Sequence, residues 1–334
     1  MFRSGRSASV SLMSLIAGAS LVVSVTPVAT AATAGAPAAA RAATCAEAWN
    51  LVATERAAMA AEDAAAWQRV SDGFLSISDA SYDGPVSNAA GAVSSTSADV
   101  ATALTSDSEG DPPLGAFDAA LGALGTACVD LSVTKNSRQV PKFQRFDYQT
   151  GTVSGLSRDA NARATASVAA IVDRAVAQAL KANRGPCMAG AKSCAYFVAT
   201  LDKRPCVPGL VCLRQVWGLL PAGANDSEGV VDALAVDSLT GRRVPLRRVL
   251  PAAATPAFLT GLNAAVQKKL ADGGLGNEPL WDTTLKLKDV HAWLPQPDGI
   301  HVWFERYAVA PGSFGIVHVV VPWPAGTPRL TAAS

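Results

Sequence analysis

Six cysteines constrain the fold of this 334-residue chain more than any other feature, because the N-terminus indicates export. Arg3 and Arg6 precede an uncharged apolar run over residues 10–25, and residues 29–31 (Ala-Thr-Ala) form a small-x-small cleavage site. In an oxidising compartment, an even number of cysteines indicates disulfides rather than a zinc site. We therefore predict a secreted protein that is cross-linked by disulfides.

The apolar run is too short to favour a permanent membrane span. It has 16 residues, whereas a spanning helix needs about 20. We predict that residues 1–31 are a cleaved signal peptide and that no stable span remains; an uncleaved anchor is the alternative. Residues 32–43 are predicted to be an Ala/Pro linker, and residues 325–334 a tail.

The disulfide pairing is predicted from proximity in the sequence. Cys187–Cys194 and Cys206–Cys212 would each close a short Gly/Pro-containing loop beside an expected hairpin, and Cys45–Cys128 then follows by elimination. Six cysteines allow 15 pairings in all, so the others stay open.

Residues 44–131 have a helical pattern. Thr44 and Glu47 have the spacing of a capping box, which predicts a helix start at residue 44. Apolar residues then recur every three or four positions, and the clearest stripe comprises Leu114, Phe117, Leu121, Leu124, Cys128 and Leu131. We predict a small helical bundle.

The length of the first helix conflicts with the Cys45–Cys128 pairing. A continuous helix over residues 45–75 would be about 45 Å long and would put the two cysteines at opposite ends of a three-helix bundle. A disulfide requires Cα atoms within about 7 Å. Either the helix breaks near Glu62-Asp63, giving four helices, or the pairing is wrong; we favour the break.

The pattern changes after residues 132–142, a polar stretch without periodicity that we predict to be a linker. The remainder, 143–324, is predicted to be an α+β domain with an antiparallel-rich sheet and two packed helices. We expect helices at 158–182 and 256–271, with Thr255 as the cap of the second, and strands at 194–201, 211–220, 230–237, 300–307 and 316–321.

The net charge of +1 hides a division between the two halves. Residues 42–131 carry 13 acidic and two basic side chains, a net of −11, whereas residues 132–334 carry 23 basic and 14 acidic ones, a net of +9. This composition argues against a highly basic nucleic-acid binder. The acidic bundle is instead expected to contact the basic domain within the chain.

Four arginines within seven positions are the strongest candidate for ligand binding: Arg242, Arg243, Arg247 and Arg248. Guanidinium groups bind carboxylates and phosphates in a bidentate manner, so we predict a cell-envelope polyanion or an acidic protein as the partner. A solvated turn is the alternative. Trp303 and Tyr307, near the end of an alternating strand, are added to the candidate ligand-binding residues.

No catalytic motif is present. His301 and Glu305 share a strand face but lie about 13 Å apart along the strand, too far to share a metal. The sequence has no G-x-S-x-G, H-E-x-x-H or phosphate-binding glycine loop. We therefore predict a non-enzymatic binding protein with no cofactor and no metal; the alternatives are a secreted envelope hydrolase and a ligand-free structural or antigen-like protein.

A family resemblance covers roughly residues 143–324. The run YAVAPGSFG at 307–315, the strand VHVVVP at 317–322 and the turn AVDSLTGRRVPL at 235–246 resemble the extracellular domain of the anti-sigma-V-factor lysozyme receptor, a family shared with mycobacterial secreted immunogenic proteins. The resemblance implies a receptor-like α+β domain and lysozyme as a partner. Because lysozyme is cationic, we expect the acidic bundle to bind it.

Overall fold

The computed structural model describes residues 35–60, 62–81, 83–106, 112–182, 194–221, 228–275 and 284–324. The signal peptide predicted at 1–31, the tail at 325–334 and Cys187 lie outside these residues. None of the helices in the described part of the chain combines the length and the apolarity needed to cross a membrane.

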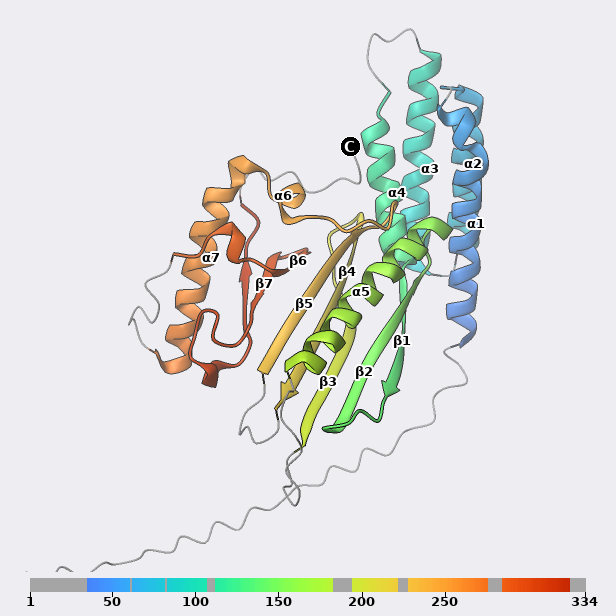
Figure 1. Cartoon of the computed structure of the whole chain (residues 1–334). Coiled ribbons are helices and arrows are strands. Elements are labelled where there is room, and N and C mark those ends of the chain that lie inside the picture. The colour runs from blue at the N-terminus through green and yellow to red at the C-terminus, as the bar shows by residue number, and fades with distance from the viewer. Residues whose placement is uncertain are drawn as a thin grey trace, which may run out of the picture.

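The N-terminal part is a bundle of four helices (Figure 1). They are α1 (Gly35–Ala60), α2 (Ala64–Ala80), α3 (Gly84–Thr105) and α4 (Leu114–Cys128). The break expected near Glu62-Asp63 is confirmed, because Glu62 has a φ of +56° and the Asp63 carboxylate caps α2 by accepting from the Ala65 amide at 3.0 Å. This break brings Cys45 and Cys128 together, and they form the predicted disulfide.

The bundle is held by one apolar core. Phe74 and Val70 of α2 are fully buried, and the Trp67 ring meets the Phe117 ring of α4 edge-on at 4.7 Å between centroids. Such an edge-to-face arrangement suits the quadrupoles of two aromatic rings. Four members of the clearest stripe therefore face a common interior: Phe117, Leu121, Leu124 and Cys128. Leu114 is 46% exposed, and Leu131 lies beyond the last helix of the bundle.

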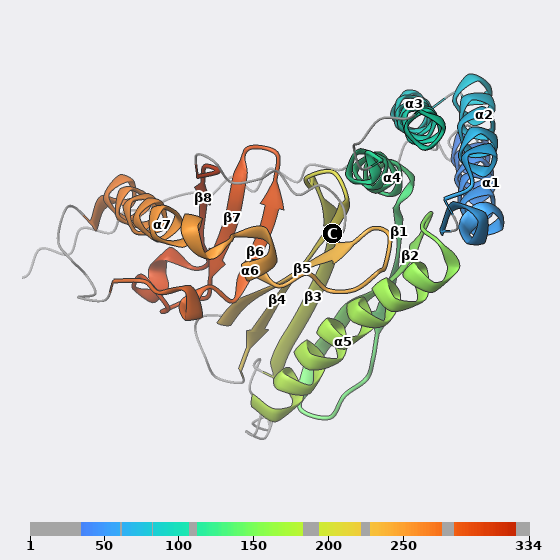
Figure 2. The same ribbon diagram turned by 90° about the horizontal axis from the view of Figure 1, so that it is seen from above.

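A five-stranded sheet follows, in the order β1-β2-β3-β4-β5. Its strands are β1 (Asp130–Ser137), β2 (Phe143–Ser154), β3 (Ala195–Arg204), β4 (Leu210–Leu220) and β5 (Glu228–Asp237). The β2–β3 pair is parallel and is joined by the crossover helix α5 (Arg158–Ala182); the other neighbouring pairs are antiparallel. Figures 1 and 2 show α5 lying across one face of this sheet, where Val168 and Ile171 are buried.

A second, three-stranded sheet forms the C-terminal part. It contains β6 (Ala292–Gln296), β7 (Gly299–Phe304) and β8 (Val317–Val321), and it is preceded by α6 (Leu246–Val249) and α7 (Thr255–Leu270). Short 3-10 turns lie at Ala252–Ala254, Leu287–Asp289 and Gly312–Phe314, and a π turn spans Ala271–Leu275.

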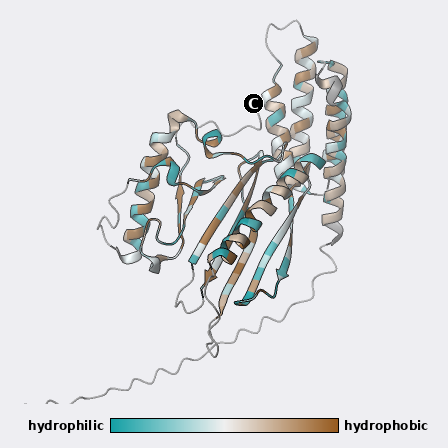
Figure 3. Cartoon of the chain, viewed as in Figure 1, coloured by the Kyte–Doolittle hydropathy of each residue, from teal (hydrophilic) through white to brown (hydrophobic). Residues whose placement is uncertain are grey.

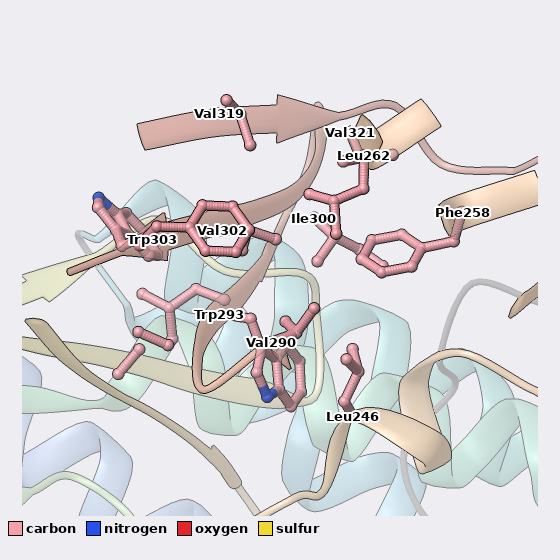
Figure 4. Close-up of a cluster of buried hydrophobic side chains, with 14 of the residues drawn as sticks. Leu246, Phe258, Leu262, Val290, Trp293, Ile300, Val302, Trp303, Val319 and Val321 are labelled. Atoms are coloured by element: carbon pink, nitrogen blue, oxygen red, sulfur yellow. The ribbon is translucent and has the colours of Figure 1, made fainter. Parts of the chain in front are cut away.

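The two sheets share one core with α7. Phe258 and Leu262 of α7 pack against Ile300 and Val321 (Figure 4), and the same cluster includes Val231 on the face of β5 opposite α5. The predicted α+β fold, with an antiparallel-rich sheet and two packed helices, is confirmed. Cys206 and Cys212 at the β3–β4 turn form the predicted disulfide, whereas the Cys187–Cys194 pairing stays a prediction.

Two expectations at the N-terminus are wrong. The predicted linker 32–43 is helical from Gly35, because its many alanines are the best helix formers. Arg41 also links this first part of α1 to the start of α3, since its guanidinium lies 3.4 Å from the Asp83 carboxylate. Thr44 is thus inside α1 and caps nothing; its hydroxyl donates to the Ala40 carbonyl.

The predicted linker at 132–142 is also corrected. Residues 130–137 form β1, an edge strand that pairs in full register with β2 from Asp130–Ser154 to Ser137–Asp147. The strand is largely exposed, so it has no apolar alternation to reveal it, and Figure 3 shows the mixed hydropathy of β1 and β2. The bundle therefore ends at Cys128 rather than at residue 131. Thr255 is likewise the first residue of α7 rather than its cap.

Neutral contacts join the bundle to the α+β domain. The Thr126 hydroxyl of α4 donates to the Leu210 carbonyl at 3.2 Å and accepts from the Gly209 amide at 3.0 Å. The Ser238 hydroxyl, after β5, donates to the Gly122 carbonyl at 3.2 Å. We call these contacts the α4 junction. The two parts are in contact, and the hydrogen bonds of the α4 junction join neutral groups; docking through the opposite net charges stays a prediction.

We expect Gly155→Ala to destabilise the protein by more than about 1 kcal/mol. Gly155 has a φ of +85°, and an added Cβ would overlap the Cys128 carbonyl beside the junction. The measurement is the free energy of unfolding in urea. The matched control is Gly84→Ala, where an added Cβ meets nothing within 4 Å. Equal stability of the two variants would contradict this account of the junction.

Candidate functional site

The turn after β5 is built around a buried aspartate. Asp237 is 2% exposed, and its Oδ1 accepts from the Leu239 amide, the Thr240 amide and the Thr240 hydroxyl at 3.1, 2.8 and 3.0 Å. Its backbone amide also bonds the Arg242 carbonyl at 2.9 Å. A carboxylate with three such donors fixes the path of the chain.

Neighbouring elements clamp the same turn from two sides. Gly241 has a φ of +67°, and an added Cβ would overlap the Ala160 carbonyl of α5. On the other side, Ser238 is fully buried against Gly125 of α4. Residues 237–248, which we call the arginine turn, therefore have a fixed start at the point where α4, α5 and β5 meet.

The four predicted arginines are all exposed on this turn: Arg242, Arg243, Arg247 and Arg248. Among the residues that the structure describes, none of their guanidiniums makes an ion pair. Several other arginines are paired: Arg214, for example, holds Asp202 in a bidentate contact at 3.1 and 2.7 Å. The arginine turn thus presents unpaired cations on a rigid support.

Trp303 is not available to a ligand, contrary to the sequence expectation. Both faces of β7 are buried, and the Trp303 ring is 4% exposed. It stacks on His318 at 4.7 Å between ring centroids, and Arg214 lies 5.8 Å from the Trp303 centroid. The ring instead helps to hold β7 against β8 and β4.

A hydrogen-bonded histidine pair lies beside Trp303. Asp298 Oδ1 is 2.9 Å from His301 Nε2, and His301 Nδ1 is 3.1 Å from His318 Nε2. Burial lowers the pKa of His318 to about 4, and the positive charges of His301, Arg214, Arg204 and Lys269 act in the same direction. The hydrogen bond from His301 lowers the pKa of the Asp298 carboxyl. The sequence analysis considered His301 only with Glu305 and rejected those two as metal ligands; it missed the histidine pair because the pair depends on β7–β8 pairing.

Tyr307 is 61% exposed and has a φ of +68°, which is unusual for a residue other than glycine. Its ring lies against Gly312, where an added Cβ would overlap it, and the Arg306 guanidinium is 5.0 Å from the ring centroid. Tyr307 is therefore accessible, as the sequence suggested.

The candidate residues do not form one site. The arginine turn follows the last residue of β5, whereas Glu305, two residues before Tyr307, lines a cavity together with Glu228 at the first residue of β5. A second basic region lies around the β1–β2 turn, where a cavity of about 430 Å³ is lined by residues 137–146, including Arg138 and Arg145.

Metal binding has no support from the geometry that we describe. Within the described ranges, no three histidine, cysteine, aspartate or glutamate side chains come together as ligands. His291 is exposed, and the other two histidines are bonded to each other.

The C-terminal part of the chain matches the model of a protein family whose function is unknown. Residues 254–324 match the family described as a protein of unknown function, DUF3298. This region lies within the C-terminal domain to which the sequence resemblance was assigned, but the lysozyme-receptor resemblance itself stays a prediction. A search of the curated proteins found no match.

Two solved structures are similar to the chain. One is a DUF3298 family protein from Pseudomonas aeruginosa PAO1, with 14% identity, coverage of 58% of this chain and 90% of that one, and a TM-score of 0.41. The other is a DUF3298 family member from Bacteroides fragilis NCTC 9343, with 13% identity, coverage of 60% and 94%, and a TM-score of 0.37.

We expect His318 to make the protein sensitive to acid. Because the pKa of His318 falls from 6.5 to about 4 on folding, the unfolded chain binds the proton first, and stability falls as the pH drops from about 6.5 to 4. His318→Gln should flatten the pH dependence of the unfolding free energy over this interval. His291→Gln, at an exposed ring, is the matched control and should keep the wild-type slope. A wild-type slope in His318→Gln would refute the assignment.

Proposed function

We propose that this protein is a secreted, non-enzymatic binding protein that holds an anionic polymer of the cell envelope through the arginine turn. The observation that carries this proposal is the set of four exposed guanidiniums, none of which makes an ion pair within the described residues, on a turn whose start is fixed by Asp237, Ser238 and Gly241. The positive net charge of residues 132–334 adds a favourable long-range field.

The fixed start of the arginine turn lowers the free-energy cost of binding an anion. Ordering a long side chain on binding costs about 0.5–1.5 kcal/mol, and a mobile loop would add the cost of ordering its backbone. The arginine turn has its first residues ordered before the ligand arrives. Guanidiniums then bind phosphate or carboxylate groups through paired N–H donors, and repeated anionic groups along a polymer can occupy several of them at once.

Replacing all four arginines by glutamine tests the proposal. With sodium polyphosphate and poly-L-glutamate as probes, we expect at least about tenfold weaker binding at low salt, and a slope of log K against log salt that is smaller by roughly 3. The control removes the same charge elsewhere, through Lys268→Gln, Lys269→Gln, Lys286→Gln and Lys288→Gln. If both variants weaken binding equally, the net charge rather than the arginine turn binds the polymer, and the proposal fails.

A second candidate rests on the resemblance to the lysozyme receptor and on the acidic bundle. Residues 42–131 have a net charge of −11, and exposed carboxylates such as Glu47 and Asp72 lie on α1 and α2. A cationic protein such as lysozyme is the partner that this charge favours.

Pull-down of lysozyme tests this second candidate. We expect retention at low salt and its loss at high salt, because exposed charges are screened within about a Debye length. The four-arginine variant should retain lysozyme as the wild type does, since it leaves the bundle intact. The absence of salt-sensitive retention by the wild type would remove lysozyme as a partner.

A further inference from the structure

A cavity of about 500 Å³ lies between the end of α5, the first residues of β5 and the residue after β7. Its lining includes Gln178 and Lys181 of α5, Trp217 of β4, Glu228 and Val230 of β5, and Glu305. We call it the α5–β7 cleft. Its volume is within the range of small-molecule sites, and none of these residues belongs to the arginine turn.

A polar cluster continues from the cleft into the sheet. Asp232 is two residues beyond Val230 on the same strand face, and its carboxylate accepts from Trp217 Nε1 at 3.2 Å and lies 3.3 Å from Arg174 Nη1. Directly opposite Asp232 on β4 is Gln215, which is fully buried. Among the described residues, neither atom of the Gln215 amide has a partner, and buried amides of this kind are normally satisfied.

Two carboxyl groups near the cleft, those of Asp232 and Glu305, have raised pKa values. Burial raises the pKa of Asp232, against the opposing hydrogen bond from Trp217 and the charges of Arg174 and Arg243. Burial also raises the pKa of Glu305; the negative charge of Asp232 adds to this effect and His291 opposes it.

The mixture of charges selects the class of ligand. An anion would meet Glu228 and Glu305, whereas a cation would meet Lys181 and Arg174 next to Asp232. A neutral ligand that both donates and accepts hydrogen bonds avoids both penalties. The partly exposed side chain of Val230 adds apolar surface of the kind that packs on the C–H face of a sugar ring, whereas Trp217, which is 5% exposed, adds little.

We propose that the α5–β7 cleft is a binding site for a neutral saccharide. In this arrangement Gln178 and Lys181 donate to sugar hydroxyls from one wall, and Glu228 and Glu305 accept from the other. The lining of this cleft shares no residue with the arginine turn. The cleft would bind a neutral sugar and the arginine turn an anionic group, and sugar binding does not require that the turn binds a polymer.

Titration of the purified protein with N-acetylchitotriose and with maltotriose tests the proposal by calorimetry. We expect saturable binding of at least one trisaccharide. The double variant Glu305→Gln/Gln178→Ala should weaken it by about tenfold, the loss expected for two hydrogen bonds. The matched control, Glu47→Gln/Gln267→Ala, makes the same changes at exposed positions on α1 and α7 and should bind as the wild type does.

Two further arms keep the test decisive. In the wild-type protein, the NMR signal of the Trp217 indole N–H should shift on sugar addition, which does not depend on how well the variant folds. The variant Arg242→Gln/Arg247→Gln/Arg248→Gln, which keeps the Arg243 charge that acts on Asp232, should keep sugar binding, so that failure of the proposed function and failure of this site are distinguished. Binding of neither sugar, preference for the zwitterionic dipeptide Ala-Ala, or equal weakening by the control would each overturn the proposal.

Discussion

The contact between α4 and the turns at one end of the large sheet is the constraint on which the rest of the structure depends. Ser238 donates to Gly122 and packs on Gly125, while Thr126 bonds both backbone groups at the β3–β4 turn. Glycines and small hydroxyl side chains allow this close approach. Because Ser238 directly follows Asp237, the same contact that joins the bundle to the sheet also fixes the start of the arginine turn.

Those parts of the fold that bury an apolar face could be predicted from the sequence. The helical stripes of the bundle and of α5 were readable for this reason, and the disulfide distance requirement predicted the break near Glu62-Asp63. β1 could not be found in this way, because an exposed edge strand is specified by its partner β2 rather than by alternation of its own residues. The alanine-rich start of α1 has high helix propensity but no apolar face to reveal it.

Some of the candidate sites could likewise be predicted from the sequence, and others could not. The arginines could be found because charge clusters are visible in the sequence, and exposed turns keep them at the surface. Trp303 was misjudged because a strand with an apolar and a polar face can still be covered on both sides, here by α7 and by β4. The histidine pair depends on the register of β7 and β8, and the α5–β7 cleft depends on the packing of α5 and the chain after β7 beside β4 and β5, so neither can be found from local sequence patterns.

The most direct test of the central claim is to locate the bound anion on the free, folded protein. NMR observation of arginine Nε–H groups during titration with sodium polyphosphate can distinguish the two basic regions. The account predicts that the signals of Arg242, Arg243, Arg247 and Arg248 shift together and saturate at one ligand concentration. Shifts confined to Arg138 and Arg145 at the β1–β2 turn, with the four signals unchanged, would contradict it.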